Sequence, residues 1–526
     1  GDKSVKLTWD DAAERSVDPV TNQFDFEGYR IYRSTDPDFL DARIVTDASG
    51  QPSGNGQPIA QFDLANSITG FFPVVIENLP SYFLGTDSGI RHTYEDNTVT
   101  NGQTYYYAVC AYDHGSEQPL FYPSENSYSI SRTLRGGVLY PTNVVQVRPN
   151  PRVTGFERAT LGAPAHVAGR GVGQVAVEVA NSTQVPNGHR FRIEFANDDA
   201  DSVRASRYSL IDSTTGETWY TTGNDFVGSG RGPVGAGILP IVSSPGVISI
   251  DSTGWAAGSP TNAKLIVTYL PSRPIELKRP GFPENLEIRF ADTFVDTSVA
   301  FNRLPAKPAK FQVIALTDTG ETRMRFAFLD TLNATTGYDG TLSLVSPLPE
   351  RIDVLTSPPG APQSNADFTW RFQLDPTGPT GGALRPPRAG DVYRLKLEIP
   401  FEPGDAFSFT TTAETAAPGS TAGKSEPYVV PNPYLGAASF EPAPFNIKGR
   451  GERRIEFRGI ALGAVVRIYN VHGDLVQTLR QDGSFDGFVP WNLRTKDNLD
   501  VAPGLYVYRV EAPGQAGFTG KFAVVK

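Results

Sequence analysis

Residues that could do chemistry are few in this chain, and they lie far apart. The five histidines show neither the i,i+4 spacing of a helical metal site nor an H-E-x-x-H motif. A zinc or transition-metal centre needs ligands that such spacing brings together. We therefore expect no metal centre of this kind. The histidines are His92, His114, His166, His189 and His472.

The single cysteine, Cys110, lies in the middle of an apolar and aromatic run, Tyr105–Tyr112. A nucleophilic thiol needs a nearby base and a lowered pKa, so we interpret Cys110 as a small buried or half-buried side chain. One cysteine also excludes any disulfide within the chain. No G-x-S-x-G elbow is present to expose a catalytic serine. We expect a protein that is not an enzyme and has no catalytic residues of its own.

Two patterns could suggest a bound cofactor. Gly230-Arg-Gly-Pro-Val-Gly235 matches a dinucleotide-binding string, but strand-like, proline-interrupted sequence follows it where a helix is required. Clustered turn acids offer oxygen ligands that suit calcium, yet none has the spacing of a calcium loop. We expect no cofactor and interpret these acids as solvated turn residues, with structural calcium as an alternative that no motif supports. The acids are Asp36, Asp38, Asp41 and Asp47, and the loop residues Asp18, Asn22 and Asp25.

Length and charge narrow the class of protein. At 526 residues, the chain has room for three to four domains of roughly 150 residues each. The 47 basic and 57 acidic residues give a net charge of −10 without a basic cluster, which argues against nucleic acid as a partner. No run of 18 apolar residues exists, so we expect no membrane span. Because the chain begins at Gly1 and its only methionine is Met324, we expect a trimmed start or a fragment.

The elements that must position any site are short strands. Val5, Leu7 and Trp9 alternate with polar residues, and Tyr105-Tyr-Tyr-Ala-Val-Cys-Ala-Tyr112 predicts a second strand with Tyr105, Tyr107, Val109 and Ala111 inward. Residues 1–138 resemble a fibronectin type III domain with a long insertion at 35–90. That resemblance makes Tyr105 a corner tyrosine whose hydroxyl ties back to the backbone.

The motif Val-x-Pro-Asn-Pro occurs twice, at 147–151 and 429–433, and we interpret each copy as the entrance to a domain. No amphipathic helix of ten residues is evident, so the fold class is all-β, with tandem β-sandwich domains of fibronectin III or immunoglobulin-like type. The predicted domains are 1–138, 139–280, 281–425 (ending in a small-residue linker at 412–425) and 426–526.

The last hundred residues repeat short apolar blocks bounded by glycine, proline or asparagine, ending in Gly520-Lys-Phe-Ala-Val-Val-Lys526. The blocks, in the order in which they occur along the chain, resemble the C-terminal immunoglobulin-like (type A) sorting domain of type IX secretion cargo from the Bacteroidota and relatives such as the Rhodothermota. The resemblance implies that the type IX machinery recognises a set of residues in this domain. They are Pro431, Asn432, Pro433, Gly473, Leu475, Gly504, Tyr506, Gly520, Lys521 and Lys526.

The resemblance implies a protein outside a Gram-negative cell or on its surface. The expected partners are the type IX machinery and either copies of the chain itself or other surface proteins. We expect a non-catalytic structural or adhesive protein, such as a subunit of an extracellular filament or surface layer. Two alternatives stay open: the accessory C-terminal half of a larger secreted hydrolase, and an array of carbohydrate-binding modules. Sorting domains of this kind are commonly removed at the cell surface, but we favour retention of 426–526 as a building block.

Overall fold

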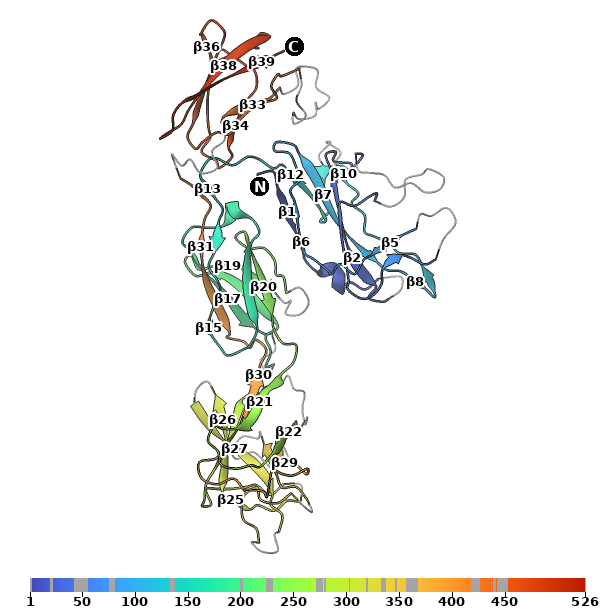
Figure 1. Ribbon diagram of the computed structural model, residues 1–526, viewed down its shortest axis with the longest axis vertical. Coiled ribbons are helices and arrows are strands. Elements are labelled where there is room, and N and C mark those ends of the chain that lie inside the picture. The colour runs from blue at the N-terminus through green and yellow to red at the C-terminus, as the bar shows by residue number, and fades with distance from the viewer. Residues whose placement is uncertain are drawn as a thin grey trace. The chain divides into compact units, whose positions relative to one another are not determined.

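Figure 1 shows the computed structural model of the chain, whose regular secondary structure is almost entirely antiparallel strands. The described residues contain two short 3-10 helices, Ala12–Arg15 and Ser182–Gln184, and no α-helix. The all-β prediction is therefore confirmed. The structure describes the whole chain except residues 1, 19–21, 42–54, 75–80, 133–137, 199–201, 224–229, 271–277, 279–280, 302, 318–319, 333–336, 346–347, 356–367, 418–425, 437, 439–440, 442–452 and 526.

The chain divides into two compact units. The first unit combines residues 1–160, 179–187 and 412–526, and the second combines 161–178 and 188–411.

The first unit begins with a sandwich. One layer has the strand order β12-β7-β2-β3, and β1 pairs with β6 in the other. The apolar residues of β1, Val5 and Leu7, pack against Tyr105 and Tyr107 of β7, as their alternation predicts. The strands are β1 (Val5–Thr8), β2 (Phe26–Ser34), β3 (Ala60–Asp63), β6 (Thr93–Asp96), β7 (Tyr105–Asp113) and β12 (Val144–Val147).

Both faces of β7 are buried, which the alternation of its residues did not predict. Tyr105 and Tyr107 face the core between the layers, while Tyr106, Ala108 and Cys110 pack on the opposite face. On that opposite face, Tyr128, Ile130 and Tyr140 cover the sheet. Val109 and Ala111, expected to point inward, are only half-buried.

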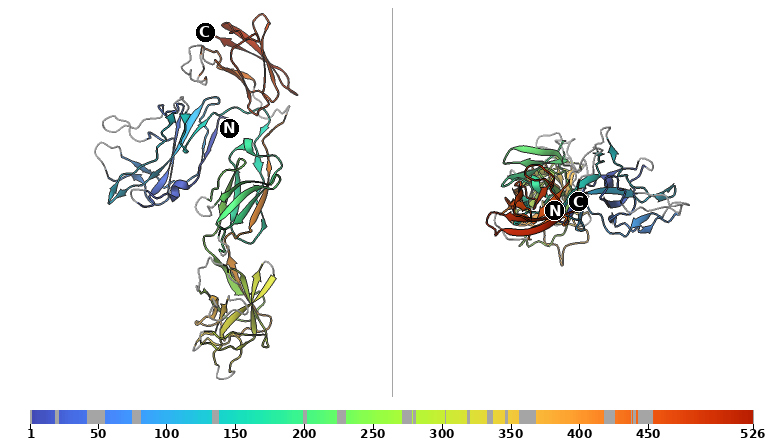
Figure 2. Two further views of the ribbon diagram at one scale, coloured as in Figure 1. Left: turned by 180° about the vertical axis from the view of Figure 1, so that it is seen from behind. Right: turned by 90° about the horizontal axis from the view of Figure 1, so that it is seen from above.

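A second sandwich in the first unit is formed by the last hundred residues. Its two layers have the orders β33-β34-β37 and β36-β35-β38-β39, and side chains from both layers share one core. Figure 2 shows this part, coloured red, from behind and from above. Its strands are β33 (Tyr428–Val430), β34 (Ile455–Arg458), β35 (Val465–Tyr469), β36 (Leu475–Arg480), β37 (Phe488–Trp491), β38 (Gly504–Glu511) and β39 (Phe518–Val524).

The second unit has two sheet systems. The smaller one runs β14-β31-β17-β18-β19, with β15 also paired to β31, and β16 pairs separately with β20. β18 and β19 pair antiparallel as a hairpin. The strands are β14 (Thr160–Leu161), β15 (Ala165–Ala168), β16 (Gln174–Val179), β17 (Arg190–Ala196), β18 (Arg207–Asp212), β19 (Glu217–Gly223), β20 (Ile238–Ser243) and β31 (Ala406–Thr412).

The larger system is an eight-stranded sheet in the order β21-β30-β23-β26-β27-β28-β29-β22, around an extensive hydrophobic core. The ten-residue β27 pairs with β26 along its first half and with β28 along its second. The strands are β21 (Ser249–Trp255), β22 (Leu265–Tyr269), β23 (Asn285–Phe290), β26 (Phe311–Thr317), β27 (Gly320–Leu329), β28 (Arg351–Leu355), β29 (Phe368–Leu374) and β30 (Val392–Glu398).

The domain boundary predicted near residue 280 is wrong. It falls between β22 and β23, which both belong to the eight-stranded sheet. After that sheet the chain returns to the smaller system, where β31 pairs with β17. The predicted domains 139–280 and 281–425 are therefore not consecutive; one sheet system is inserted into the other. Pairing between segments about 200 residues apart leaves no signal in local periodicity.

Candidate recognition site on the C-terminal domain

Nine of the ten residues predicted for recognition lie in the second sandwich of the first unit, residues 426–526, which we call the C-terminal domain. Lys526 lies outside the described residues. The other nine fall into three groups. Pro431, Asn432 and Pro433 lie beside the edge strand β39, Gly473 and Leu475 lie at the turn between β35 and β36, and Gly504, Tyr506, Gly520 and Lys521 lie in β38 and β39.

The first group covers the edge of β39. The Asn432 side chain accepts a hydrogen bond from Ala523 N–H at 3.2 Å, and its Nδ2 donates to the Lys521 carbonyl at 3.4 Å. Two residues on, Tyr434 N–H donates to the Ala523 carbonyl at 2.9 Å. Pro431 and Pro433 bring no N–H of their own, so the segment satisfies the edge and offers little for further pairing.

The second group is a turn. The Asn470 side chain accepts hydrogen bonds from His472 N–H and Asp474 N–H, both at 2.9 Å. Gly473 has φ +90°, a conformation that favours glycine, so its place in the motif has a structural cause. Leu475, which opens β36, leaves 39 % of its surface exposed.

The third group is mainly core. Tyr506 is buried, stacks on Phe522 with ring centroids 5.5 Å apart, and donates its hydroxyl to the Ala502 carbonyl at 2.6 Å. A Cβ on Gly520 would lie 2.4 Å from the Tyr508 ring, so this position in β39 has no room for a side chain. Tyr506 and Gly520 thus shape the domain and present little surface to a partner.

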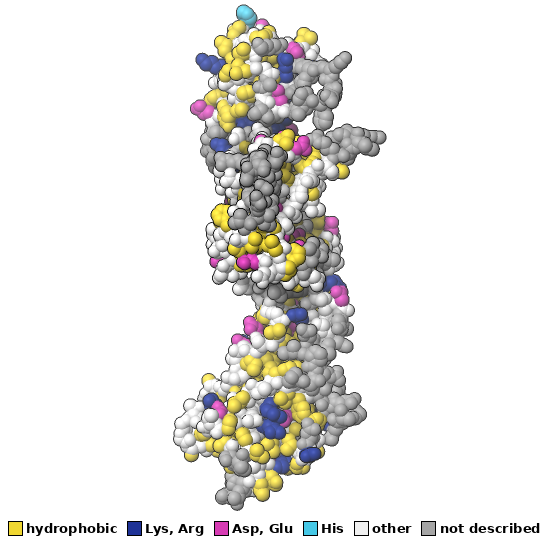
Figure 3. All heavy atoms as spheres, turned by 90° about the vertical axis from the view of Figure 1, so that its right-hand side faces the viewer, with side chains coloured by type: hydrophobic (Ala, Val, Ile, Leu, Met, Phe, Trp, Pro, Cys, Tyr) yellow, Lys and Arg dark blue, Asp and Glu magenta, His cyan; other side chains and the backbone are white. Residues whose placement is uncertain are grey.

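The exposed apolar and charged members of the predicted set lie on one face of the four-stranded sheet. Leu475 pairs with Tyr469, Tyr469 with Val507, and Val507 with Lys521, so a row of side chains crosses all four strands. Val507 is 36 % exposed and its neighbour Leu505 is 59 % exposed. We call Leu475, Leu505, Val507 and Lys521 the outer face. In Figure 3 this domain is at the top, and hydrophobic side chains are visible on the side of it that faces the viewer.

The motif comparison missed Leu505 and Val507. Their signal is in the sequence, because Leu505-Tyr-Val-Tyr508 is apolar at every position, where a half-buried strand would alternate with polar residues. Exposed apolar side chains that lie together often mark a surface for a partner.

The groups considered for chemistry are held in structural contacts. His92, His166 and His189 each lie beside a carboxylate: Glu14 at 2.5 Å, Asp405 at 3.1 Å and Asp212 at 2.6 Å, respectively. His114 contacts the Gly115 carbonyl, and His472 lies in the turn described above.

Cys110 is fully buried, and burial raises the pKa of its thiol. Such a thiol is a poor nucleophile, which agrees with the sequence-based interpretation of this residue.

The turn acids, for which structural calcium was only an alternative interpretation, also have local partners. Asp41 accepts hydrogen bonds from Ser34 and Thr35, and Asp36 accepts one from Asp38 N–H at 2.9 Å. Asp47 lies outside the described residues. Among the residues that the structure describes, no three histidine, cysteine or acidic side chains are grouped to hold a metal ion. The expectation of no cofactor stays a prediction.

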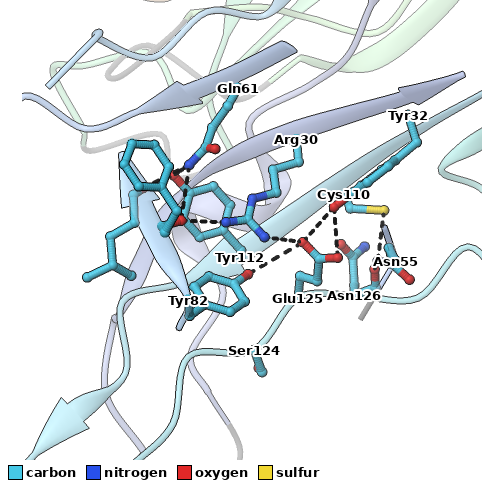
Figure 4. A network of polar contacts seen from close by, with 12 residues as sticks. Arg30, Tyr32, Asn55, Gln61, Tyr82, Cys110, Tyr112, Ser124, Glu125 and Asn126 are labelled. Atoms are coloured by element: carbon cyan, nitrogen blue, oxygen red, sulfur yellow. Dashed lines mark hydrogen bonds and ion pairs between the residues drawn. The ribbon is translucent and has the colours of Figure 1, made fainter. Parts of the chain in front are cut away.

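Part of the insertion at 35–90 is anchored to the first sandwich by the network in Figure 4. The Arg30 guanidinium lies 4.3 Å from the Tyr82 ring centroid and 4.7 Å from that of Tyr112, and it donates to Glu125 at 3.1 Å and to the Phe83 carbonyl. Cation–π contacts of this kind are stronger when the cation is desolvated. One arginine of β2 therefore holds residues 82–83 and Glu125 against the sheet.

Comparison with known proteins adds little to the description of this chain. No protein-family model and no curated protein matches the chain. Among solved structures, PorZ, a surface component of the type IX secretion system of Porphyromonas gingivalis, is 13 % identical, with 85 % of this chain and 68 % of that chain covered and a TM-score of 0.16. A tetra-tandem repeat from the extending region of a large adhesion protein is 10 % identical, with 99 % of both chains covered and a TM-score of 0.13. TM-scores this low carry no argument about function.

Within the part of the chain that the structure describes, no helix is long and apolar enough to cross a membrane.

Proposed function

We propose that this chain is a non-catalytic, secreted or cell-surface protein that works by contact, and that residues 426–526 direct its export by type IX secretion. The observation that carries the proposal is the outer face. There, two residues of the sorting resemblance, Leu475 and Lys521, share one row with the exposed Val507. An exposed apolar row ending in a lysine suits recognition by another protein.

The non-catalytic role is supported by the contacts of the titratable groups. Three histidines lie beside carboxylates, and the single thiol is buried with a raised pKa. We further propose that the C-terminal domain stays with the mature protein as a building part of a filament, layer or adhesive surface. Glycan binding by the purified chain would favour the carbohydrate-binding alternative. A catalytic signature encoded upstream of Gly1 would favour the accessory half of a hydrolase.

Export is tested with the full chain behind a signal peptide in a bacterium with type IX secretion and in a matched strain that lacks the translocon. We expect the chain outside the first strain only. The double variant Leu505→Ser and Val507→Ser should lower the exported fraction by about tenfold, because it removes the apolar centre of the outer face. Both side chains are exposed, so the fold should survive.

The matched control is Leu139→Ser, which changes a 55 % exposed leucine in the first sandwich and should leave export unchanged. Export that is equal in both strains would contradict the type IX assignment. Export of the double variant at the level of the unmodified chain would contradict the role of the outer face.

A further inference from the structure

The C-terminal domain contacts a segment that lies about 300 residues before it in the chain, within the same compact unit. This segment, residues 147–153, leaves β12 of the first sandwich and contains the first Val-x-Pro-Asn-Pro motif. We call it the exit segment. It lies against residues 454–458 and 485–488 of the C-terminal domain, which we call the acceptor surface.

A buried carboxylate lies at the centre of the contact. Glu456 is fully buried, and Arg454 and Arg458 of its own domain donate to it at 3.0 Å and 2.9 Å. Arg148 of the exit segment donates to the same carboxylate, and its Nε donates to the Gly102 carbonyl at 2.8 Å. A buried charge is tolerated when it is fully paired, so Arg148 completes a cluster that the C-terminal domain only partly fills.

The backbones also pair. Val153 N–H donates to the Phe485 carbonyl at 2.9 Å, and Gly487 N–H donates to the Pro151 carbonyl at 2.7 Å. Arg152 and Asp486 form the antiparallel bridge between these two hydrogen bonds. This is the geometry of an added strand, in which main-chain hydrogen bonds give affinity and side chains give specificity.

The side chains on this short ladder are selective. Asp486 accepts from Asn150 at 3.1 Å and from Arg152 at 3.2 Å, one partner on each carboxylate oxygen. A Cβ on Gly487 would lie 2.3 Å from the Arg152 carbonyl, so the close approach requires glycine at 487. The surface thus fits an extended Arg-Pro-Asn-Pro-Arg sequence, residues 148–152.

Both Pro-Asn-Pro copies consequently cover edges of the same domain. The second copy covers β39 through Asn432, and the first covers residues 485–487, just before the edge strand β37. Proline-rich cover of this kind protects sheet edges from pairing with other chains. Neither copy acts only as a domain entrance, which is the role that the sequence suggested.

We propose that the acceptor surface binds the exit segment firmly enough to hold the C-terminal domain on the first sandwich after the backbone is cut between residues 418 and 425. The partner of this surface is the Arg-Pro-Asn-Pro-Arg segment of the same chain. Cleavage in that linker then yields a nicked protein that keeps its last domain. The inference goes beyond the proposed function and holds whether or not the chain is exported.

The test uses the full chain with a site for a sequence-specific protease placed within residues 418–425. After complete cleavage, the two fragments should elute together in native size-exclusion chromatography at about 1 μM, and native mass spectrometry should detect their one-to-one complex. Arg148→Ala leaves Glu456 with one partner fewer, and Gly487→Ala blocks the close approach to Arg152. Each variant should raise the dissociation constant of the fragments by at least about tenfold.

Arg467→Ala is the matched control, because Arg467 pairs with Glu511 on the same domain, away from the acceptor surface. It should leave the complex unchanged. Melting of each uncut variant reports whether the domains still fold. Separation of the unmodified fragments at micromolar concentration would overturn the proposal. So would co-elution that is equally strong in Arg148→Ala, Gly487→Ala and the control.

Discussion

Truncation of Tyr107 tests the inner face of the first sandwich most sharply. The Tyr107 ring is fully buried between β1 and β7, and its hydroxyl donates to Asp96 Oδ2 at 2.7 Å. Tyr107→Ala removes the ring and leaves a cavity, for which large aromatic truncations cost about 3–5 kcal/mol of unfolding free energy. Asp96 keeps its bonds from Thr98 and Arg33, so the lost hydrogen bond adds little to that cost.

The assay is urea denaturation followed by pulsed hydrogen exchange and mass spectrometry, which isolates the transition of peptides from β2 and β7 in the full chain. Tyr107→Phe keeps the ring and should cost only about 1 kcal/mol, the typical net worth of one hydrogen bond. Val145→Ala is the control, because Val145 pairs with Tyr107 across the sheet yet is 45 % exposed, and it should cost less than about 0.5 kcal/mol. A loss below about 1 kcal/mol for Tyr107→Ala would refute the burial of the ring.

Three further predictions concern the first sandwich. Burial raises the pKa of Glu27 to about 7, so the folded state holds a proton that the unfolded chain loses near pH 4.5. The free energy of unfolding should therefore fall as pH rises from about 4.5 to about 7. A Glu27→Gln variant that keeps the pH profile of the unmodified chain would contradict this. Cys110 should resist alkylation in the native protein and react fully in urea, since its thiol is buried; rapid labelling without denaturant would refute its placement. Arg30→Met should speed hydrogen exchange at residues 82–85, because the guanidinium that holds them is gone, whereas the exposed control Arg15→Met should not.

The sequence predicted the local elements well. Alternation located β1 and β7, and the corner role of Tyr105 is confirmed, since Thr100 N–H donates to the Tyr105 hydroxyl at 2.9 Å. Both features depend on residues that lie close together in the chain, so local periodicity and turn-forming residues are enough to predict them.

Long-range arrangement was not predictable in the same way. The second face of β7 is buried by Tyr128, Ile130 and Tyr140. The pattern of residues within β7 itself does not predict this cover. The pairing of β31 with β17 spans about 200 residues, and the acceptor surface joins segments about 300 residues apart. In the candidate site, the motif identified Leu475 and Lys521 but not Leu505 and Val507, whose exposure depends on which layer of the sandwich covers them.

Mass spectrometry of fractionated cells that make this protein tests the central claim most directly. The account predicts the chain in the surface or extracellular fraction, with peptides from 1–411 and from 453–525 in equal amounts. A nick between 418 and 425 would not change that ratio, since the acceptor surface holds the domain. A chain confined to the cell interior would contradict export. An external protein that ends near residue 425, with its C-terminal domain lost, would contradict the retention of that domain.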